Sequence, residues 1–218
     1  MDERGDSLSE QVYLSLRESI VRGEFYPGFR LLVLEISNSL NISQAPVREA
    51  MERLKQEGLL VSKHNKGSFV AEIRQEELEE IYELREIIEW NAIKKSLPGL
   101  LDSDIAYLSE VFEKMKQAAE IDDLFQFIDL DMEFHRFFYF KSGNKTILQI
   151  WDQINVKIKR FLAIANKLYY SDLMTIAEGH LPLIEALQRR NEEEIEKLFM
   201  QHLKDVWWLM NKKNNTRG

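Results

Sequence analysis

The sequence predicts a mainly α-helical protein with two domains: an N-terminal winged helix-turn-helix and a C-terminal all-helical antiparallel bundle. Two short amphipathic segments separated by a break lie before residue 60, and two β-prone runs flank a basic turn after it. Beyond Ala71, glycine and proline become rare and long helical patterns take over. We therefore place the first domain at 1–74, a short polar linker at 71–75 and the helical domain at 76–212.

The N-terminal region contains the pattern of a helix that reads DNA. An amphipathic segment from Leu31 to Leu40 ends at Asn41, and the Ser43 hydroxyl is expected to cap the next helix. Apolar residues in that next helix repeat at helical spacing, which predicts one buried face. The polar face suits base edges and phosphates, and it carries Ser43, Gln44, Arg48 and Arg53.

The residues after this helix predict a basic β-wing. Gly58 ends the helix, and the runs 59–61 and 68–70 form the two strands. The turn between them is polar and basic, which suits phosphate or the minor groove. The alternative is an ordinary helix and hairpin in a small globular domain. The residues that we predict to contact DNA are Arg30, Ser43, Gln44, Arg48, Arg53, Lys63, His64, Lys66 and Gly67.

Residues 8–74 resemble the winged helix-turn-helix of the GntR family of bacterial transcription regulators. The resemblance rests on an amphipathic helix at 11–22, the turn Tyr26-Pro27-Gly28, and the runs 46–50, 57–59 and 67–70. It implies a palindromic double-stranded DNA operator bound by a homodimer, since one reading helix covers only a half-site. Many relatives carry Ser-Arg where this chain has Ser43-Gln44, and Gln prefers adenine edges where Arg prefers guanine. We therefore expect the operator sequence to differ from that of these relatives at the base pair that Gln44 contacts.

The second domain is predicted to contain six helices and an inward-facing group of histidines. The helices are expected at 76–97, 102–120, 122–142, 145–168, 172–190 and 192–211. Asp131 and His135 are four residues apart, so they project from one helix face, and that face is apolar. His180 and His202 lie on the apolar faces of two other helices. Taken singly, each histidine is more often a core residue with a partner, but together with Asp131 they form a set that fits a divalent metal.

This pattern also resembles a known metal site. The spacing of Asp131-x-x-Phe134-His135, followed by His180 and then His202 in the last helix, resembles that of the FCD domain. This is the effector domain of the FadR-type branch of the GntR family, and the match spans 76–211. The resemblance implies a helical bundle with a metal at its centre and small organic acids as effectors. Zn²⁺ is the expected ion, with Ni²⁺ or Mn²⁺ as alternatives.

Two further residues are candidates for binding the effector. Arg85 falls within the apolar stripe of helix 76–97. Either it binds a carboxylate of the effector, or it pairs internally with Glu89, four residues further on. Asn155 flanks an apolar stripe in its own helix and is predicted to line the same cavity.

The composition is compatible with this organisation. The formal net charge is −8, but residues 1–74 hold 10 Lys/Arg and 11 Asp/Glu, whereas 75–218 hold 19 and 26. The acidity therefore belongs to the bundle and does not exclude a DNA-binding module. The chain has no cysteine, which excludes a disulfide scaffold and a thiolate site. With neither a signal peptide nor a membrane-spanning run, we expect a cytoplasmic protein.

The sequence thus predicts a non-enzymatic transcription regulator, acting as a repressor, that contains a metal and responds to a small carboxylate. Two alternatives remain: a metalloenzyme that uses the three-histidine, one-aspartate set, and a regulator whose metal is purely structural. The fused DNA-reading module and the lack of an obvious general base favour regulation.

Overall fold

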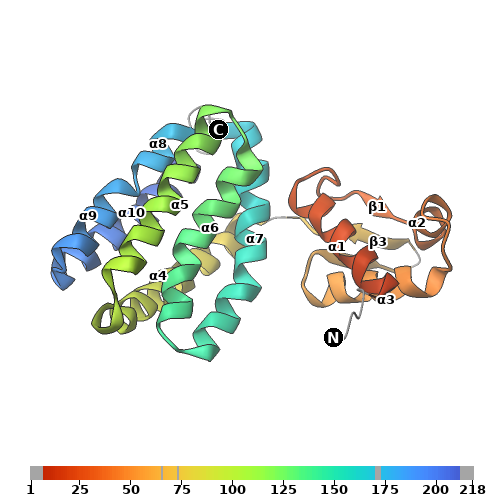
Figure 1. Cartoon of the computed structure of the whole chain (residues 1–218). Coiled ribbons are helices and arrows are strands. Elements are labelled where there is room, and N and C mark those ends of the chain that lie inside the picture. The colour runs from red at the N-terminus through yellow and green to blue at the C-terminus, as the bar shows by residue number, and fades with distance from the viewer. Residues whose placement is uncertain (1–6, 65, 73, 170–172, 212–218) are drawn as a thin grey trace. The chain divides into compact units, whose positions relative to one another are not determined.

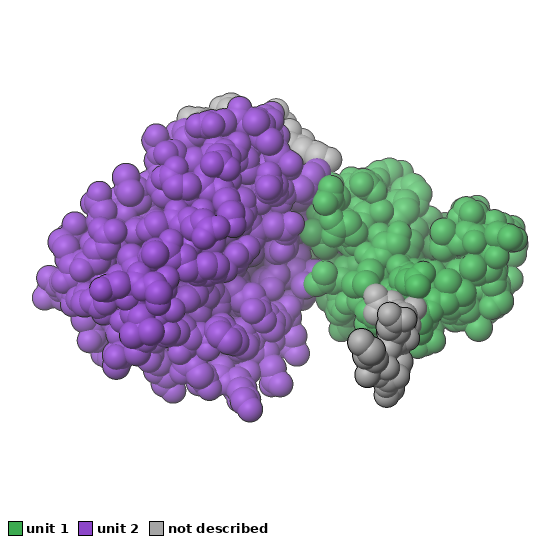
Figure 2. Space-filling model, viewed as in Figure 1, with its two compact units in different colours: residues 1–74 green, residues 75–218 purple. Residues whose placement is uncertain are grey.

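The computed structural model describes residues 7–64, 66–72, 74–169 and 173–211, and it divides into two compact units (Figures 1 and 2). Unit 1 comprises Met1–Arg74 and unit 2 comprises Gln75–Gly218. Unit 1 contains every strand of the described chain, and unit 2 is built from helices. The predicted fold class is therefore confirmed.

Unit 1 is a winged helix-turn-helix. It consists of α1 (Leu8–Val21), β1 (Arg30–Leu31), α2 (Val33–Ser39), α3 (Gln44–Gln56), β2 (Leu60–Lys63) and β3 (Gly67–Val70). β3 is the central strand of an antiparallel sheet and pairs with β1 on one side and β2 on the other. β1 was not predicted, because two residues are too few to show a periodic pattern.

Local sequence explains the ends of the two helices in the helix-turn-helix. Asn41 has a φ of 52° and Gly58 a φ of 71°, so each chain reversal uses a residue that tolerates the left-handed region. Ser43 is the N-cap residue of α3 as expected, but its hydroxyl makes no capping hydrogen bond, which corrects that part of the prediction. The apolar face of α3 is buried as predicted, at Val47, Ala50, Met51 and Leu54.

Unit 2 is a helical bundle around α6. Its elements are α4 (Gln75–Ser96), the 3₁₀ helix η1 (Leu97–Gly99), α5 (Asp102–Glu120), α6 (Leu124–Lys141), α7 (Lys145–Tyr169), α8 (Leu173–Glu178), α9 (Leu181–Arg189) and α10 (Glu192–Asn211). α6 packs against α4, α5 and α7, and α10 packs against α4 and α9. The connections on either side of α6 are short, so successive helices there run antiparallel. None of the described helices is long and apolar enough to cross a membrane.

The predicted helix at 172–190 is wrong as a single element. The chain forms α8 and α9 instead, with Gly179 and His180 between them. Pro182 occupies the first turn of α9, where it has no N–H to donate and its ring would collide with the carbonyl of Glu178 in a continuous helix. The periodicity of the apolar residues concealed this break, which proves important for the site.

Candidate metal centre and DNA-reading module

Four side chains from separate parts of unit 2 converge at the centre of the bundle. Asp131 and His135 come from α6, His180 from the α8–α9 junction and His202 from α10. All four are buried, and one ligand atom from each lies within 4.8 Å of the others. In a tetrahedral zinc site the ligand atoms lie about 3.4 Å apart, from bond lengths of about 2.0–2.1 Å. The group is somewhat wider than that, and its imidazole and carboxylate donors are the types that a divalent metal requires.

Glu89 on α4 orients His135. The Nδ1–H of His135 donates to Glu89 Oε1, which leaves Nε2 facing Asp131 Oδ1 at 3.9 Å. The hydroxyl of Tyr139 donates to Glu89 Oε2 at 3.1 Å, so this carboxylate is itself held in place. A carboxylate that fixes the tautomer of a ligating histidine is a frequent feature of protein metal sites.

The break between α8 and α9 orients His180. Its Nδ1–H lies 3.1 Å from the carbonyl of Ile176 and 3.3 Å from that of Ala177, two carbonyls in the last turn of α8. Such carbonyls have no partner within their own helix and readily accept from a side chain. Nε2 of His180 is left 3.1 Å from Asp131 Oδ1 and makes no hydrogen bond of good geometry among the described residues. Both Nε2 atoms thus face the same carboxylate oxygen.

Gly179 lies at this junction, next to His202. A β-carbon on Gly179 would lie 3.6 Å from Nδ1 of His202 and 3.2 Å from the carbonyl oxygen of Ile176. The ring centroids of His180 and His202 are only 4.4 Å apart. A side chain at position 179 would therefore touch His202 at an ordinary contact distance and would crowd the Ile176 carbonyl, which accepts from His180.

Burial and neighbouring charge set the protonation of the group. Burial favours a higher pKa for Asp131, but the adjacent His180 and the nearby His135 and Arg85 outweigh it and hold the pKa below its usual range. Burial lowers the pKa of His135, against the opposing effect of Glu89, and it lowers that of His202 much further. An ionised carboxylate with neutral imidazoles is the state in which these residues bind a metal.

Arg85 lies beside this group and has an internal partner. Its Nε–H donates to Glu89 Oε2 at 2.8 Å, and both side chains are buried. The pair lowers the pKa of Glu89 to about 2, with Arg85 and His135 together overcoming the effect of burial. Of the two interpretations of Arg85, the structure contains the internal pair. Nη2 of Arg85 nevertheless has no hydrogen-bond partner among the described residues, so it remains able to donate.

Unit 1 presents several of the residues that we predicted to contact DNA near one another. Arg48 is exposed on α3 and donates to Oε1 of Gln44 one turn earlier. The Arg30 side chain lies beside Gly67 at the base of the wing, since a β-carbon on that glycine would be 3.6 Å from Arg30 Nε. Exposed residues of the wing and of the start of α3 complete the surface, and they are Ser43, Lys63, His64, Lys66 and Gly67.

Arg53 has a different environment from the one predicted. Its Nη1 donates to Glu10 of α1 at 2.5 Å, and its guanidinium stacks 3.7 Å from the centre of the Tyr13 ring. The side chain therefore joins α3 to α1 within unit 1. We assign it a structural role instead of a place on the reading surface.

Comparisons with known proteins match both units. Residues 8–70 match the family model described as bacterial regulatory proteins, gntR family, and residues 80–205 match that of the FCD domain. The chain belongs to the GntR family. It is 29% identical over 179 residues to the Nta operon transcriptional regulator of Aminobacter aminovorans, covering 82% of this chain and 83% of that one. It is 25% identical to the HTH-type transcriptional repressor RspR of Escherichia coli, covering 91% and 87%.

A solved structure agrees with this membership over nearly the whole chain. E. coli McbR/YncC superposes with a TM-score of 0.81 at 25% identity, covering 96% of this chain and 99% of that one. The relatives in Aminobacter aminovorans and Escherichia coli are named as transcriptional regulators. With its gntR-family domain, this chain is a transcriptional regulator as well.

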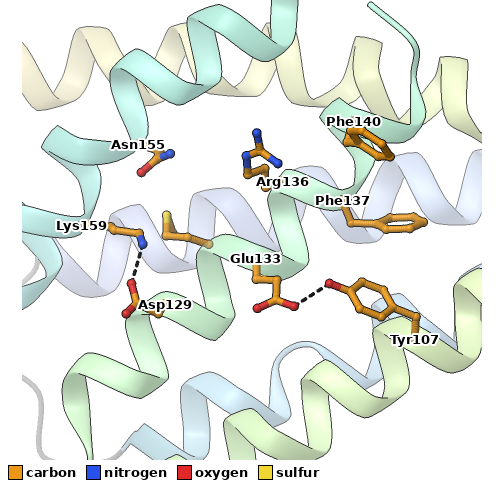
Figure 3. A pocket seen from close by; sticks show the side chains of 9 residues that line it. Tyr107, Asp129, Glu133, Arg136, Phe137, Phe140, Asn155 and Lys159 are labelled. Atoms are coloured by element: carbon orange, nitrogen blue, oxygen red, sulfur yellow. Dashed lines mark hydrogen bonds and ion pairs between the residues drawn. The ribbon is translucent and has the colours of Figure 1, made fainter. Parts of the chain in front are cut away.

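In this GntR-family regulator, Asn155 lies in a pocket on the outer side of α6 (Figure 3). The pocket has a volume of about 430 Å³ and is also lined by Tyr107, Arg136, Phe140 and Lys159. Neither Arg85 nor any member of the four-residue group lines it. The prediction that Asn155 shares a cavity with Arg85 is therefore not supported.

The contacts of three residues beside the candidate metal centre were not predicted. The contact of Glu89 with His135 joins helices 46 residues apart, and no spacing rule connects them. Tyr139 and Trp151 stack with ring centroids 4.5 Å apart, and the Arg85 guanidinium lies 5.2 Å from the Trp151 ring. In the sequence both aromatics are indistinguishable from core residues.

Proposed function

We propose that this protein is a metal-containing transcriptional repressor that binds a palindromic operator as a homodimer and responds to a small carboxylate. The observation that carries the proposal is the buried group of Asp131, His135, His180 and His202, fused to a winged helix-turn-helix. Relatives whose names include the word repressor support the direction of regulation.

The residues at the site fit a divalent metal. Burying a carboxylate without a donor is costly, and the Nε2 atoms of His135 and His180 that face Asp131 carry no hydrogen when their Nδ1–H groups donate elsewhere. His135 and His180 each have Nδ1 committed to another acceptor, which leaves Nε2 available as a ligand. When bound there, a divalent cation would supply positive charge and Lewis acidity at the centre of the bundle. Donor chemistry alone does not select among Zn²⁺, Ni²⁺ and Mn²⁺.

The neighbouring Arg85 supports a carboxylate as the effector. Four protein ligands leave one or two positions free on a five- or six-coordinate ion. The Nη2 of Arg85 is a buried donor without a partner among the described residues. Guanidinium groups bind carboxylates through charge-assisted hydrogen bonds, which are stronger than neutral ones. Arg85 would hold the acid beside the metal through Nη2, while its Nε–H continues to donate to Glu89.

The reading surface supports a dimer on a two-fold symmetric site. α3 carries Gln44 and Arg48 at its N-terminal end, where recognition helices contact base edges. The wing adds Lys63, His64 and Lys66, which suit phosphates. A single module of this kind covers one half-site, so a second copy is needed for specific binding.

The test measures metal content, acid binding and operator affinity on the same purified protein. We expect about one divalent metal per chain in the wild type and its loss in His135→Ala, with Arg136→Ala as the matched control on the exposed face of α6. A carboxylate that binds metal-loaded protein should change operator affinity, because a ligand shifts an equilibrium only through unequal binding to the two states. Full metal occupancy in His135→Ala would refute the metal centre. Acid binding without a change in operator affinity would refute the response.

A further inference from the structure

A second unsatisfied donor lies next to Arg85. Trp151 on α7 is completely buried, and its Nε1–H has no hydrogen-bond partner among the described residues. Buried indole N–H groups usually find an acceptor, since leaving one unpaired costs free energy. The Arg85 guanidinium, which also has an unpaired Nη2, lies 5.2 Å from the Trp151 ring. The two donors without partners thus belong to neighbouring side chains of the buried core, and one ligand lying beside both could accept from each.

Trp151 is held rigidly in the network of the candidate metal centre. Its ring stacks on Tyr139 at 4.5 Å with an interplanar angle of 17°. The Tyr139 hydroxyl donates to Glu89, which accepts from both Arg85 and His135. The indole is thus fixed relative to the same carboxylate that orients a proposed metal ligand. A donor held in this way can discriminate between ligands, because it does not move to find another acceptor.

The donors at this place determine how many acceptor oxygens the ligand needs. A carboxylate has two oxygens, and in the proposed function one meets the metal and the other meets Arg85 Nη2. The indole N–H then requires a further oxygen on the ligand, close to the carboxylate. A hydroxyl or carbonyl on the adjacent carbon supplies that oxygen within the reach of one small molecule.

The buried charge specifies the ligand's charge. The charged side chains acting on the group are Asp131, Glu89 and Arg85, which together carry one net negative charge. A divalent metal reverses this to one net positive charge, which a monoanion neutralises. A dianion would leave an uncompensated buried charge, and such a charge is costly.

We propose that the effector is a monocarboxylate with a hydroxyl or carbonyl oxygen next to its carboxylate, and that Trp151 selects it by donating its indole N–H to that oxygen. This rests on the proposed function, because it assumes that the carboxylate binds at Arg85. It assigns Trp151 a specificity role that is separate from the binding of the carboxylate itself.

The test pairs acids that differ only in this oxygen. Straight-chain monocarboxylates of two to six carbons and their 2-hydroxy analogues, such as propionate and lactate, are titrated calorimetrically into the metal-loaded full-length protein. Malate serves as the dianion. The variants are Trp151→Phe, which removes the donor and keeps an aromatic ring, and Trp90→Phe as the matched tryptophan control on α4. Metal content is measured for each.

We expect the wild type and Trp90→Phe to bind a hydroxy acid about tenfold more tightly than its parent acid, the ratio that one net hydrogen bond supplies. Trp151→Phe should bind both members of the pair equally, at the affinity of the parent acid. Malate should bind more weakly than the matching monoanion. In wild-type protein, the indole N–H resonance of Trp151 should shift on adding the hydroxy acid and not the parent acid, which provides a test independent of any variant.

The outcomes separate this inference from the function on which it rests. A hydroxyl preference that persists in Trp151→Phe, or is absent from the wild type, would overturn the role of Trp151 while leaving carboxylate binding intact. Tighter binding of malate would overturn the charge argument. If no acid of the series bound the metal-loaded wild type, the proposed carboxylate response would itself be wrong.

Discussion

At the scale of single residues, the same residue type serves different purposes according to its neighbours. Arg48 and Arg53 lie on one helix, five residues apart, yet Arg48 faces solvent and Arg53 is paired with Glu10 and stacked on Tyr13. Exposure leaves the first free to contact a base or a phosphate. Engagement by α1 makes the second part of the module's packing.

The two arginines should therefore fail in different ways. Arg48→Ala should weaken operator binding by about 1–3 kcal/mol, the usual value for a base contact, without changing the melting temperature. Arg53→Ala should lower the melting temperature of the DNA-reading module, because α1 and α3 lose a hydrogen-bonded and stacked contact. Fluorescence anisotropy and thermal unfolding of both variants provide the comparison, with Arg22→Ala, the residue that follows α1, as a control. If Arg53→Ala lost as much operator affinity as Arg48→Ala and kept its melting temperature, Arg53 would be a DNA-contacting residue after all.

Glu89 offers a second residue-scale prediction, because it acts on the metal through His135. Glu89→Gln keeps the size of the side chain and removes the charge that orients the imidazole and pairs with Arg85. Metal affinity should fall about 10–100-fold, the range typical of such outer contacts. Competition with a chromophoric chelator measures it, and Glu86→Gln on the same helix is the control. Unchanged affinity would show that His135 does not depend on Glu89.

At the scale of elements, the break between α8 and α9 does what a continuous helix cannot. Ending α8 at Glu178 frees carbonyls that accept from His180 Nδ1, and the turn directs Nε2 of that residue toward Asp131. Gly179 occupies the corner, where the helix end, His180 and His202 crowd together. A helix terminus thereby serves as the support for a side chain from the next element.

Gly179→Ala should consequently weaken metal binding with little effect on folding. The added methyl group would be 3.2 Å from the carbonyl of Ile176 and 3.6 Å from His202 Nδ1, so the junction must shift by a few tenths of an ångström. We expect a severalfold loss of metal affinity, since ligand geometry tolerates little displacement. Gly99→Ala is the matched control, because a β-carbon there meets nothing within 4 Å. Equal metal affinity in the two variants would show that the α8–α9 junction accommodates a β-carbon at position 179.

At the scale of the whole molecule, the buried group should link folding to pH and to metal. The folded-state pKa values of His135 and His202 are lowered from 6.5, so in the metal-free protein the unfolded chain takes up protons first. Their contribution to stability is present above about pH 6.5 and is lost as the pH falls below it. A metal that binds only the folded chain adds stability by mass action and excludes protons from the same nitrogens.

Thermal unfolding from pH 8 to pH 5.5 tests this linkage. Metal-free protein should lose melting temperature steadily below about pH 6.5, and metal-loaded protein should melt higher and hold its melting temperature to a lower pH. His202→Leu, which removes the most strongly perturbed imidazole, should flatten the profile of the metal-free protein. A metal-free profile that is flat over this range would contradict the buried, neutral state of the histidines.

The sequence by itself determined the architecture and the four convergent residues. Helical periodicity, the turn residues Asn41 and Gly58, and the basic wing are local signals, and each acts within a few residues of chain. The inward faces of α6 and α10 followed from spacing alone, so Asp131, His135 and His202 were readable as buried. Spacing also placed Arg85 and Glu89 on one face, four residues apart.

Tertiary structure alone decided how these residues are used. The contacts of Glu89 with His135 and of Arg53 with Glu10 join positions more than 40 residues apart, and no local rule specifies such pairs. Pro182 is present in the sequence, but the regular apolar pattern continues across it, and the break between α8 and α9 was therefore not predicted. Nη2 of Arg85 and Nε1 of Trp151 have no partner among the described residues, and this becomes evident only once the core is packed. Whether a buried polar group has a hydrogen-bond partner depends on the whole packed core, and for that reason it could not be predicted from the sequence.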